Sequence, residues 1–198
     1  MKNIEINTDH VGLVYKNGTF KKAITAGNYW FWSGETVEVY DQSKTFIATT
    51  ELNVLLLDKT FEPLVHVIDV RDKEIALVFQ NGNFKQVLAP GKYAFWKGLN
   101  NYSFLTVDIS DYNTTDSIER YILEKPQMSA YVRSFKVENY ETGLMLIDGK
   151  FEKELPAGTY FWWKNPTNIQ VLKADTRLQN MDISGQEILT RDTKHNSG

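Results

Sequence analysis

The stretch that decides the fold is GLVYKNGTF at residues 12–20, because related stretches recur twice further along the chain. They read ALVFQNGNF at residues 76–84 and GLMLIDGKF at residues 143–151, which are offsets of 64 and 67 residues. The match continues past these nine residues with an aliphatic residue, a Gly, a Tyr and a Trp at constant spacing. These residues are Ile24, Gly27, Tyr29 and Trp32, then Leu88, Gly91, Tyr93 and Trp96, then Leu155, Gly158, Tyr160 and Trp163. Such self-similarity predicts three tandem repeats.

Each repeat carries two turn signals. The first is a type I′ hairpin pair, whose two central residues need positive φ: Asn17-Gly18, Asn81-Gly82 and Asp148-Gly149. The second is a turn that ends in a glycine suited to a left-handed corner: Gly27, Gly91 and Gly158. Strands are predicted before, between and after the turns, at residues 12–15, 19–24 and 29–32 in the first repeat. Each repeat is therefore expected to open as a three-stranded antiparallel meander.

The segments between the meanders also match. Residues 36–40, 103–109 and 168–173 are predicted closing strands, and residues 63–70 and 130–137 are predicted strands that lead into the next repeat. Residues 50–58 and 116–125 begin at or directly after a Thr that precedes an acidic residue, Thr50-Glu51 and Thr115-Asp116, which favours short helices of two or three turns. For residues 54–57, periodicity alone does not decide between helix and strand.

The predicted fold class is α+β and mainly β, with three tandem small antiparallel β-meander repeats joined by short helices. The expected domains are residues 1–49, 50–115, 116–175 and a final segment at 176–198. The glycines and tryptophans that define the repeat are predicted to be structural: Gly18, Gly27, Trp32, Gly82, Gly91, Trp96, Gly149, Gly158 and Trp163.

Composition and motifs argue against several function classes. The net charge of −3, with scattered Lys and Arg, is atypical of a nucleic-acid binder. The chain has no cysteine, so disulfides, thiolate nucleophiles and Cys-type zinc sites are excluded. No signal-peptide core is visible, and the apolar run at residues 54–57 is far below the roughly 20 residues of a membrane span. No phosphate-binding loop or nucleophile-elbow motif is present.

The titratable residues predict no catalytic or metal site, and no cofactor is expected. His10 and His66 fit strand surfaces, and His195 lies in a polar tail. Asp69, Asp72 and Glu74 surround Arg71, an arrangement that could hold a cation but fits a charged turn better. The chain is therefore not expected to be an enzyme.

The aromatic residues leave two interpretations open. Successive strand residues point to opposite faces, so Trp30 and Trp32 share one face while Tyr29 and Phe31 share the other. Packing between sheets or repeats is the first interpretation, and an exposed platform for a sugar or a protein is the second. Trp30 and Trp162 do not recur at their positions in the other repeats, so they are the candidate surface residues.

The repeats and the tail resemble a known family. The tripled Gly-Leu-Val…Asn-Gly-x-Phe…Pro-Gly-x-Tyr pattern is similar to the N-terminal region of bacterial slipins, which are stomatin-like proteins. The stretch KADTRLQNMDISGQEILTRD at residues 173–192 looks like the start of their SPFH (band 7) domain. The repeats also resemble those of the major vault protein. Residues 193–198 are polar and have no strand pattern, so the SPFH domain is expected to be cut off after its first residues. The N-terminal membrane hairpin of many stomatin-like proteins has no counterpart in the sequence, so membrane association is not carried over directly.

The resemblance implies a non-catalytic scaffold or adaptor that self-associates and binds protein partners. It would form the N-terminal arm of a longer protein, with peripheral membrane association through the missing SPFH domain. The implied location is the cytoplasm, at the inner face of the membrane when the arm is part of a longer chain. The alternative is a carbohydrate- or peptide-binding β module that uses exposed tryptophans.

Overall fold

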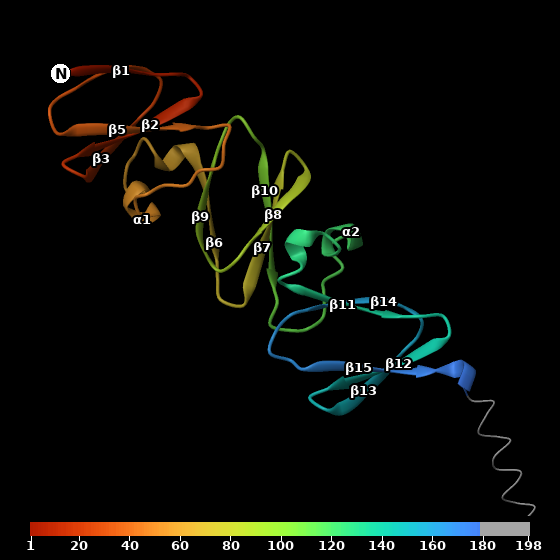
Figure 1. Cartoon of the computed structure of the whole chain (residues 1–198). Helices are drawn as coiled ribbons and strands as arrows, with labels where there is room; N and C mark the ends of the chain where they lie inside the picture. The colour runs from red at the N-terminus through yellow and green to blue at the C-terminus, as the bar shows by residue number, and fades with distance from the viewer. Residues whose placement is uncertain (179–198) are drawn as a thin grey trace, which may run out of the picture. The chain divides into compact units, whose positions relative to one another are not determined.

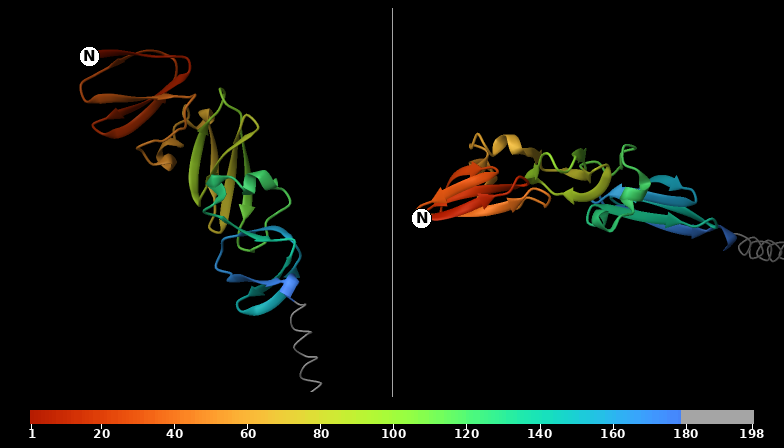
Figure 2. Two further views of the ribbon diagram at one scale, coloured as in Figure 1. Left: turned by 45° about the vertical axis from the view of Figure 1, so that its right-hand side comes forward. Right: turned by 90° about the horizontal axis from the view of Figure 1, so that it is seen from above.

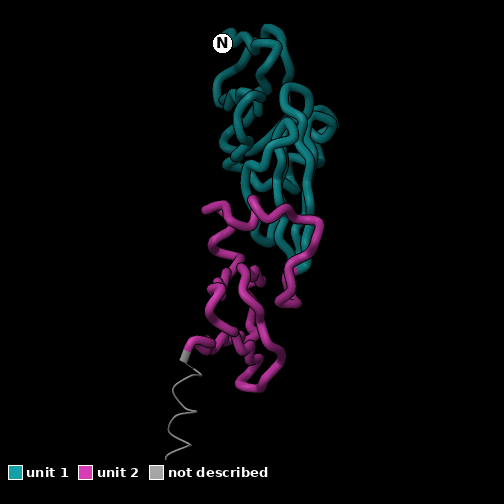
Figure 3. Tube along the Cα trace, turned by 90° about the vertical axis from the view of Figure 1, so that its right-hand side faces the viewer, with its two compact units in different colours: residues 1–108 teal, residues 109–198 magenta. Residues whose placement is uncertain are grey.

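The computed structural model describes residues 1–178, and these residues are mainly β. Strands make up 54% and helices 9% of the structure, so mainly β is a closer description than α+β. The chain divides into two compact units, residues 1–108 and residues from 109 onward (Figure 3). The segment expected at 176–198 lies outside the described residues except for 176–178.

The strands of the described residues fall, in chain order, into three groups of five, coloured from red to blue in Figure 1. The first group comprises β1 (Lys2–Ile6), β2 (His10–Lys16), β3 (Thr19–Ile24), β4 (Gly27–Phe31) and β5 (Glu35–Asp41). The second comprises β6 (Val65–Val70), β7 (Glu74–Gln80), β8 (Asn83–Leu88), β9 (Gly91–Trp96) and β10 (Tyr102–Asp108). The third comprises β11 (Val132–Val137), β12 (Glu141–Ile147), β13 (Lys150–Leu155), β14 (Gly158–Trp163) and β15 (Ile169–Asp175).

Each group forms two antiparallel sheets. The three-stranded sheets have the orders β3-β2-β5, β8-β7-β10 and β13-β12-β15, and the two-stranded sheets are β1-β4, β6-β9 and β11-β14. The prediction of a three-stranded meander is therefore wrong, because β4 does not pair with β3. It crosses to the opposite layer and pairs with β1, from Lys2 opposite Phe31 to Ile6 opposite Gly27. The closing strands are confirmed as β5, β10 and β15.

The hairpin turns explain why β2 and β3 pair as they do. Asn17 and Gly18 have φ of 52° and 79°, and the pairs 81–82 and 148–149 adopt nearly the same values. Both central residues are thus left-handed, as a type I′ turn requires, and Gly adopts this conformation without a Cβ penalty. The prediction of these turns is confirmed.

A tyrosine closes the second turn of each group. The hydroxyl of Tyr93 donates to the backbone oxygen of Ala89 at 2.9 Å, so the ring lies across Gly91. Gly91 has a φ of 151°, and a Cβ there would lie 3.3 Å from the Tyr93 hydroxyl. Tyr29 and Tyr160 make the same bond to Thr25 and Pro156. This corner directs the following strand away from its predecessor and into the second layer.

The two sheets of each group enclose a small apolar core. In the first group, Val14 and Ile24 of the larger sheet pack on Ile6 and Phe31 of the smaller one, as two layers (Figure 2). Phe95 has the place of Phe31 in the second group, and Tyr102 and Phe104 lie against it at 5.0 and 5.1 Å between ring centroids. The third core is built around Met145, Leu155 and Trp162.

The connecting helices are shorter than predicted. They are single turns, α1 (Leu52–Leu55) and α2 (Arg120–Leu123), each followed by a 3-10 turn, η1 (Glu62–Leu64) and η2 (Pro126–Met128). A last 3-10 turn, η3, covers Thr176–Leu178. Glu51 and Glu119 hold the N-cap positions without a side-chain hydrogen bond. The Thr50 hydroxyl instead bonds the hydroxyl of Tyr15 at 2.8 Å, which ties the connector to β2.

The first unit is held together by a second core outside the sandwiches. Val11, Leu13 and Tyr15 point away from the inner core of the first group and pack on Leu55 and Phe61 of the connector. Val65, Ala94 and Trp96 of the smaller sheet of the second group complete this cluster. The domain boundary expected between residues 49 and 50 thus lies inside the first unit.

Candidate docking surface

The outer face of the β1-β4 sheet is aromatic and exposed. Trp30 is 59% and Trp32 69% exposed, and Met1 beside them is also exposed. Phe31 between them is buried, so the strand alternates as the sequence predicted. We call Met1, Trp30 and Trp32 the head face.

The backbone at Trp32 is fixed although its indole is exposed. The backbone N–H of Trp32 donates to the Glu35 carboxylate at 2.9 Å, and the backbone N–H of Glu35 donates to the backbone oxygen of Trp32 at 3.1 Å. A cleft of about 520 Å³ beside the indole is lined by Lys2, Glu35 and Val37 among other residues. The backbone that carries the Trp32 indole is thus held by two hydrogen bonds.

The same positions of the second group are buried. Trp96 follows Trp32 by 64 residues and is 2% exposed, with its ring 4.7 Å from that of Phe46 and 5.9 Å from that of Phe61. Ala94 and Val65, which correspond to Trp30 and Met1, belong to the same cluster. Trp32 was predicted to be structural like Trp96 and Trp163, and that prediction is wrong, because no residue of the described chain covers it as the connector covers Trp96.

The second unit also has an exposed apolar face. On the outer side of its three-stranded sheet, Phe151 and Leu172 are exposed, and Leu144 and Leu146 are half-buried. The strand registers match these positions to Phe20, Glu38, Leu13 and Tyr15 of the first group. We call Leu144, Leu146, Phe151 and Leu172 the tail face.

Trp162 does not belong to a surface. It is 4% exposed, stacks on Tyr160 at 6.0 Å between centroids and lies 5.3 Å from Phe135. Its position in the strand corresponds to that of Phe31, which points inward, and residue Asn113 bridges to it from outside the sheet. The prediction of Trp162 as a surface residue is therefore wrong, and only Trp30 remains of that pair.

The buried indoles are placed by packing and not by polar contacts. The indole nitrogens of Trp96 and Trp163 are buried and have no hydrogen-bond partner. A buried N–H without a partner costs about 1–3 kcal/mol. The apolar contacts of these rings must outweigh that cost.

A polar cluster fastens the connector to the larger sheet of the first group. The Glu38 carboxylate accepts hydrogen bonds from the hydroxyls of Tyr40 at 2.7 Å, Tyr15 at 3.3 Å and Thr49 at 3.2 Å. Burial, followed by the bond to Glu38, raises the pKa of Tyr40 well above its usual range. Tyr40 is therefore a fixed donor at neutral pH, unsuited to proton transfer.

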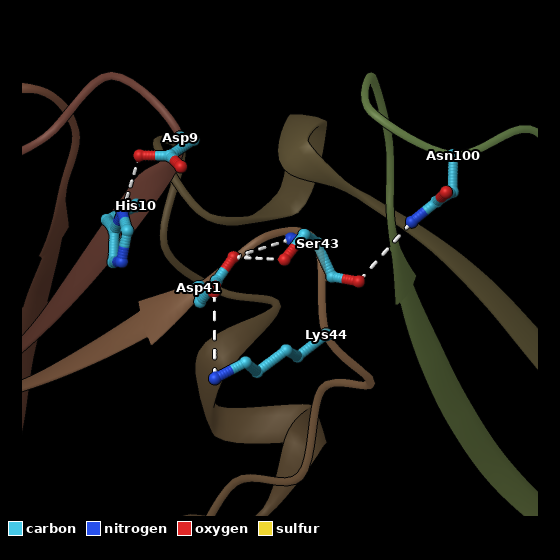
Figure 4. Close-up of polar contacts among 6 residues, drawn as sticks. All are labelled: Asp9, His10, Asp41, Ser43, Lys44 and Asn100. Atoms are coloured by element: carbon cyan, nitrogen blue, oxygen red, sulfur yellow. Dashed lines mark hydrogen bonds and ion pairs between the residues drawn. The ribbon is translucent and has the colours of Figure 1, made fainter.

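A second polar group surrounds Asp41, as Figure 4 shows. The Asp41 carboxylate accepts hydrogen bonds from the hydroxyl and N–H of Ser43 at 2.6 and 2.8 Å, and Lys44 lies at 3.8 Å. His10 bonds Asp9 instead, at 2.6 Å between Nδ1 and Oδ1. The Ser43 hydroxyl thus donates to a carboxylate and has no imidazole as a base, so the cluster is a turn.

We expect the Ser43→Ala variant to raise the pKa of Asp41. The Ser43 hydroxyl is the first cause of the lowered pKa, and the backbone N–H and Lys44 remain, so the shift reverses in part. A carboxylate with a lowered pKa stabilises the fold above its unfolded pKa, and this stabilisation is lost as pH falls through the folded pKa. Carboxyl-carbon NMR titration measures the change. Asp175, whose pKa Arg177 lowers in a similar turn, is the internal control and should not move.

The other titratable residues considered in the sequence lie on a strand surface, in a turn or outside the described residues. His66 is exposed on β6, and His195 lies outside the described residues. The Arg71 N–H donates to the Glu74 carboxylate at 3.2 Å, which confirms the charged turn there. Among residues 1–178 no cluster of His, Asp and Glu has the arrangement of a metal site.

The described part of the tail motif is a local ion pair. Arg177 bonds the Asp175 carboxylate at 2.7 Å and lies over the Tyr140 ring at 4.0 Å from its centroid. The rest of the motif, residues 179–192, lies outside the described residues.

None of the helices in the described part of the chain is long and apolar enough to cross a bilayer. Comparisons with protein-family models, with curated proteins and with solved structures returned no match for this chain.

Proposed function

We propose that the chain is a non-catalytic interaction module that self-associates through its head face. It is built, in this proposal, from three copies of one five-stranded unit joined by short helical connectors. The observation that carries the proposal is the contrast between Trp32 and Trp96. The two residues stand at matching positions, one exposed and one fully packed.

Energetics favour a role for the exposed pair. Two adjacent exposed Trp side chains on one rigid strand present a large apolar area, and each Trp can bury about 150–250 Å². At about 25 cal/mol per Å², removing such surface from water is a substantial driving force for association. Tryptophan is also the residue type most enriched among binding hot spots.

Two carboxylates of the first group hold a connector and a turn. Glu38 fixes the connector through three hydroxyls, and Asp41 closes a turn with Ser43. These contacts support the non-catalytic part of the proposal. The wider role, as the N-terminal arm of a slipin-like scaffold at the cytoplasmic side of a membrane, rests on the resemblance of residues 173–192.

Sedimentation velocity of the whole chain over a range of concentrations tests the proposal. The weight-average mass should rise with concentration, and the Trp30→Ala/Trp32→Ala variant should associate at least tenfold more weakly. Tenfold corresponds to about 1.4 kcal/mol, a modest value for two aromatic contacts. Leu57→Ala, another exposed apolar residue, is the matched control and should behave as the wild type. A strict monomer at every concentration would sink the proposal.

A second candidate is a carbohydrate-binding module that uses the same tryptophans. It is favoured by the cleft beside Trp32, where an aromatic ring adjoins both Lys2 and Glu35. Sugars bind on aromatic faces while their hydroxyls bond to neighbouring polar groups. A shift of tryptophan fluorescence on a panel of glycans would support this candidate, and a silent panel would exclude it.

A further inference from the structure

The packing inside the first unit provides a template for contact between copies. There, Val65, Ala94 and Trp96 on the outer face of the β6-β9 sheet belong to one apolar cluster with Val11, Leu13 and Tyr15 on the outer face of the β3-β2-β5 sheet. The connector carrying α1 lies in this contact, through Leu55 and Phe61. A two-stranded outer face and a three-stranded outer face are thus the two halves of one interface.

The described chain has one further two-stranded sheet and one further three-stranded sheet whose outer faces carry exposed apolar residues. The head face is the two-stranded half, since Met1, Trp30 and Trp32 occupy the positions of Val65, Ala94 and Trp96. The tail face is the three-stranded half, since Leu144 and Leu146 occupy the positions of Leu13 and Tyr15. Leu13 and Tyr15 are buried, whereas Leu144 and Leu146 remain half-buried.

The residues that differ between the two three-stranded faces indicate what the tail face accepts. Glu38 and Tyr40, which hold the connector of the first group by hydrogen bonds, are replaced at the matching positions by Leu172 and Ala174. At these two positions the tail face has apolar residues in place of the polar anchors, whereas Glu154 replaces the buried Ala23 of the first group. An apolar face without such anchors fits an aromatic surface such as the head face.

We propose that the head face of one copy docks on the tail face of a second copy, so that copies join head to tail. This inference rests on the proposed self-association and adds its geometry. The two faces are different surfaces, so the contact is heterologous and a free face remains at each end. Such a contact gives open chains unless the rotation closes a ring.

Two singly blocked variants of the whole chain test this geometry. Trp32→Glu blocks the head face and Leu172→Glu blocks the tail face, and both residues are exposed, so folding should be preserved and circular dichroism checks it. Leu99→Glu is the matched control, because Leu99 is 56% and Leu172 55% exposed. Each blocked variant alone should associate at least tenfold more weakly than the wild type, while Leu99→Glu should associate normally.

The decisive sample is the equimolar mixture of the two blocked variants. Each then offers the face that the other lacks, so a 1:1 dimer should form and nothing larger. If Leu172→Glu associates like the wild type, or if the mixture stays monomeric while the wild type associates, the head-to-tail geometry is wrong and self-association stands. If the wild type itself is monomeric throughout, the proposed function fails as well.

Discussion

Replacing Trp96 by alanine should destabilise the first unit by about 3–5 kcal/mol, whereas the same change at Trp32 should cost less than about 0.5 kcal/mol. The two residues occupy matching positions, so the chemistry of the substitution is identical. Trp96 is packed on Phe46, Phe61 and Tyr40, and its removal leaves a cavity among these rings. The Trp32 side chain is mostly in solvent.

Urea unfolding followed by far-UV circular dichroism measures both variants without relying on the lost fluorophore. Because the chain has two compact units, hydrogen exchange of β2 and β9 should assign the transition to the first unit. Equal free energies of unfolding for the two variants would contradict the packing described for Trp96. A large loss for Trp32→Ala measured at assembling concentrations would report the docking contact instead.

The Gly91→Val variant should lose about 2–4 kcal/mol of stability. A side chain at a φ of 151° costs about 1–3 kcal/mol in strain, and displacing the Tyr93 hydroxyl forfeits its bond to Ala89, worth about 1 kcal/mol. Thermal and urea unfolding of the purified variant measure the loss.

Two further variants separate these contributions. Tyr93→Phe removes the hydrogen bond alone and should cost about 1 kcal/mol. Gly82→Ala adds a Cβ at a left-handed residue where no atom lies within 4 Å, so it reports backbone strain of about 1–2 kcal/mol without a clash. If Gly91→Val costs no more than Gly82→Ala, the tyrosine corner is not what fixes β4, β9 and β14 in their layer.

Local sequence signals predicted the parts of the fold that local chemistry controls. Asn17-Gly18 and its two counterparts dictated type I′ hairpins, because few residue pairs adopt two left-handed conformations. The closing strands β5, β10 and β15 followed from their alternation. The partner of β4 was not predictable in this way, because strand pairing across a sandwich depends on contacts distant in sequence. The strand at Lys2–Ile6 had a signal, since Ile4 and Ile6 alternate with polar residues.

The candidate surface was half predictable. Strand alternation placed Trp30 and Trp32 on one face correctly, but residue type alone misassigned Trp162, whose position in β14 is that of inward-pointing Phe31. Sequence could not show that Trp32 is exposed while Trp96 is buried. Both positions are Trp, so the residue type cannot distinguish them. The difference depends on whether a connector and a neighbouring sheet cover the side chain. The turn residues alone did not predict the tyrosine corner. The Gly-x-Tyr spacing that recurs in all three repeats was the sequence signal that could have predicted it.

The narrow sheets leave many backbone edges unpaired. Among the described strands only β2, β7 and β12 pair with another strand on both sides, so β3, β8 and β13 are edge strands of their sheets. Each of these strands contains a register shift at which one charged residue has no opposite residue on the neighbouring strand: Lys21, Lys85 and Glu152. Bulges and charges on an edge strand hinder indiscriminate strand addition, the route to amyloid-like aggregates. Strand addition is therefore disfavoured at these three edges.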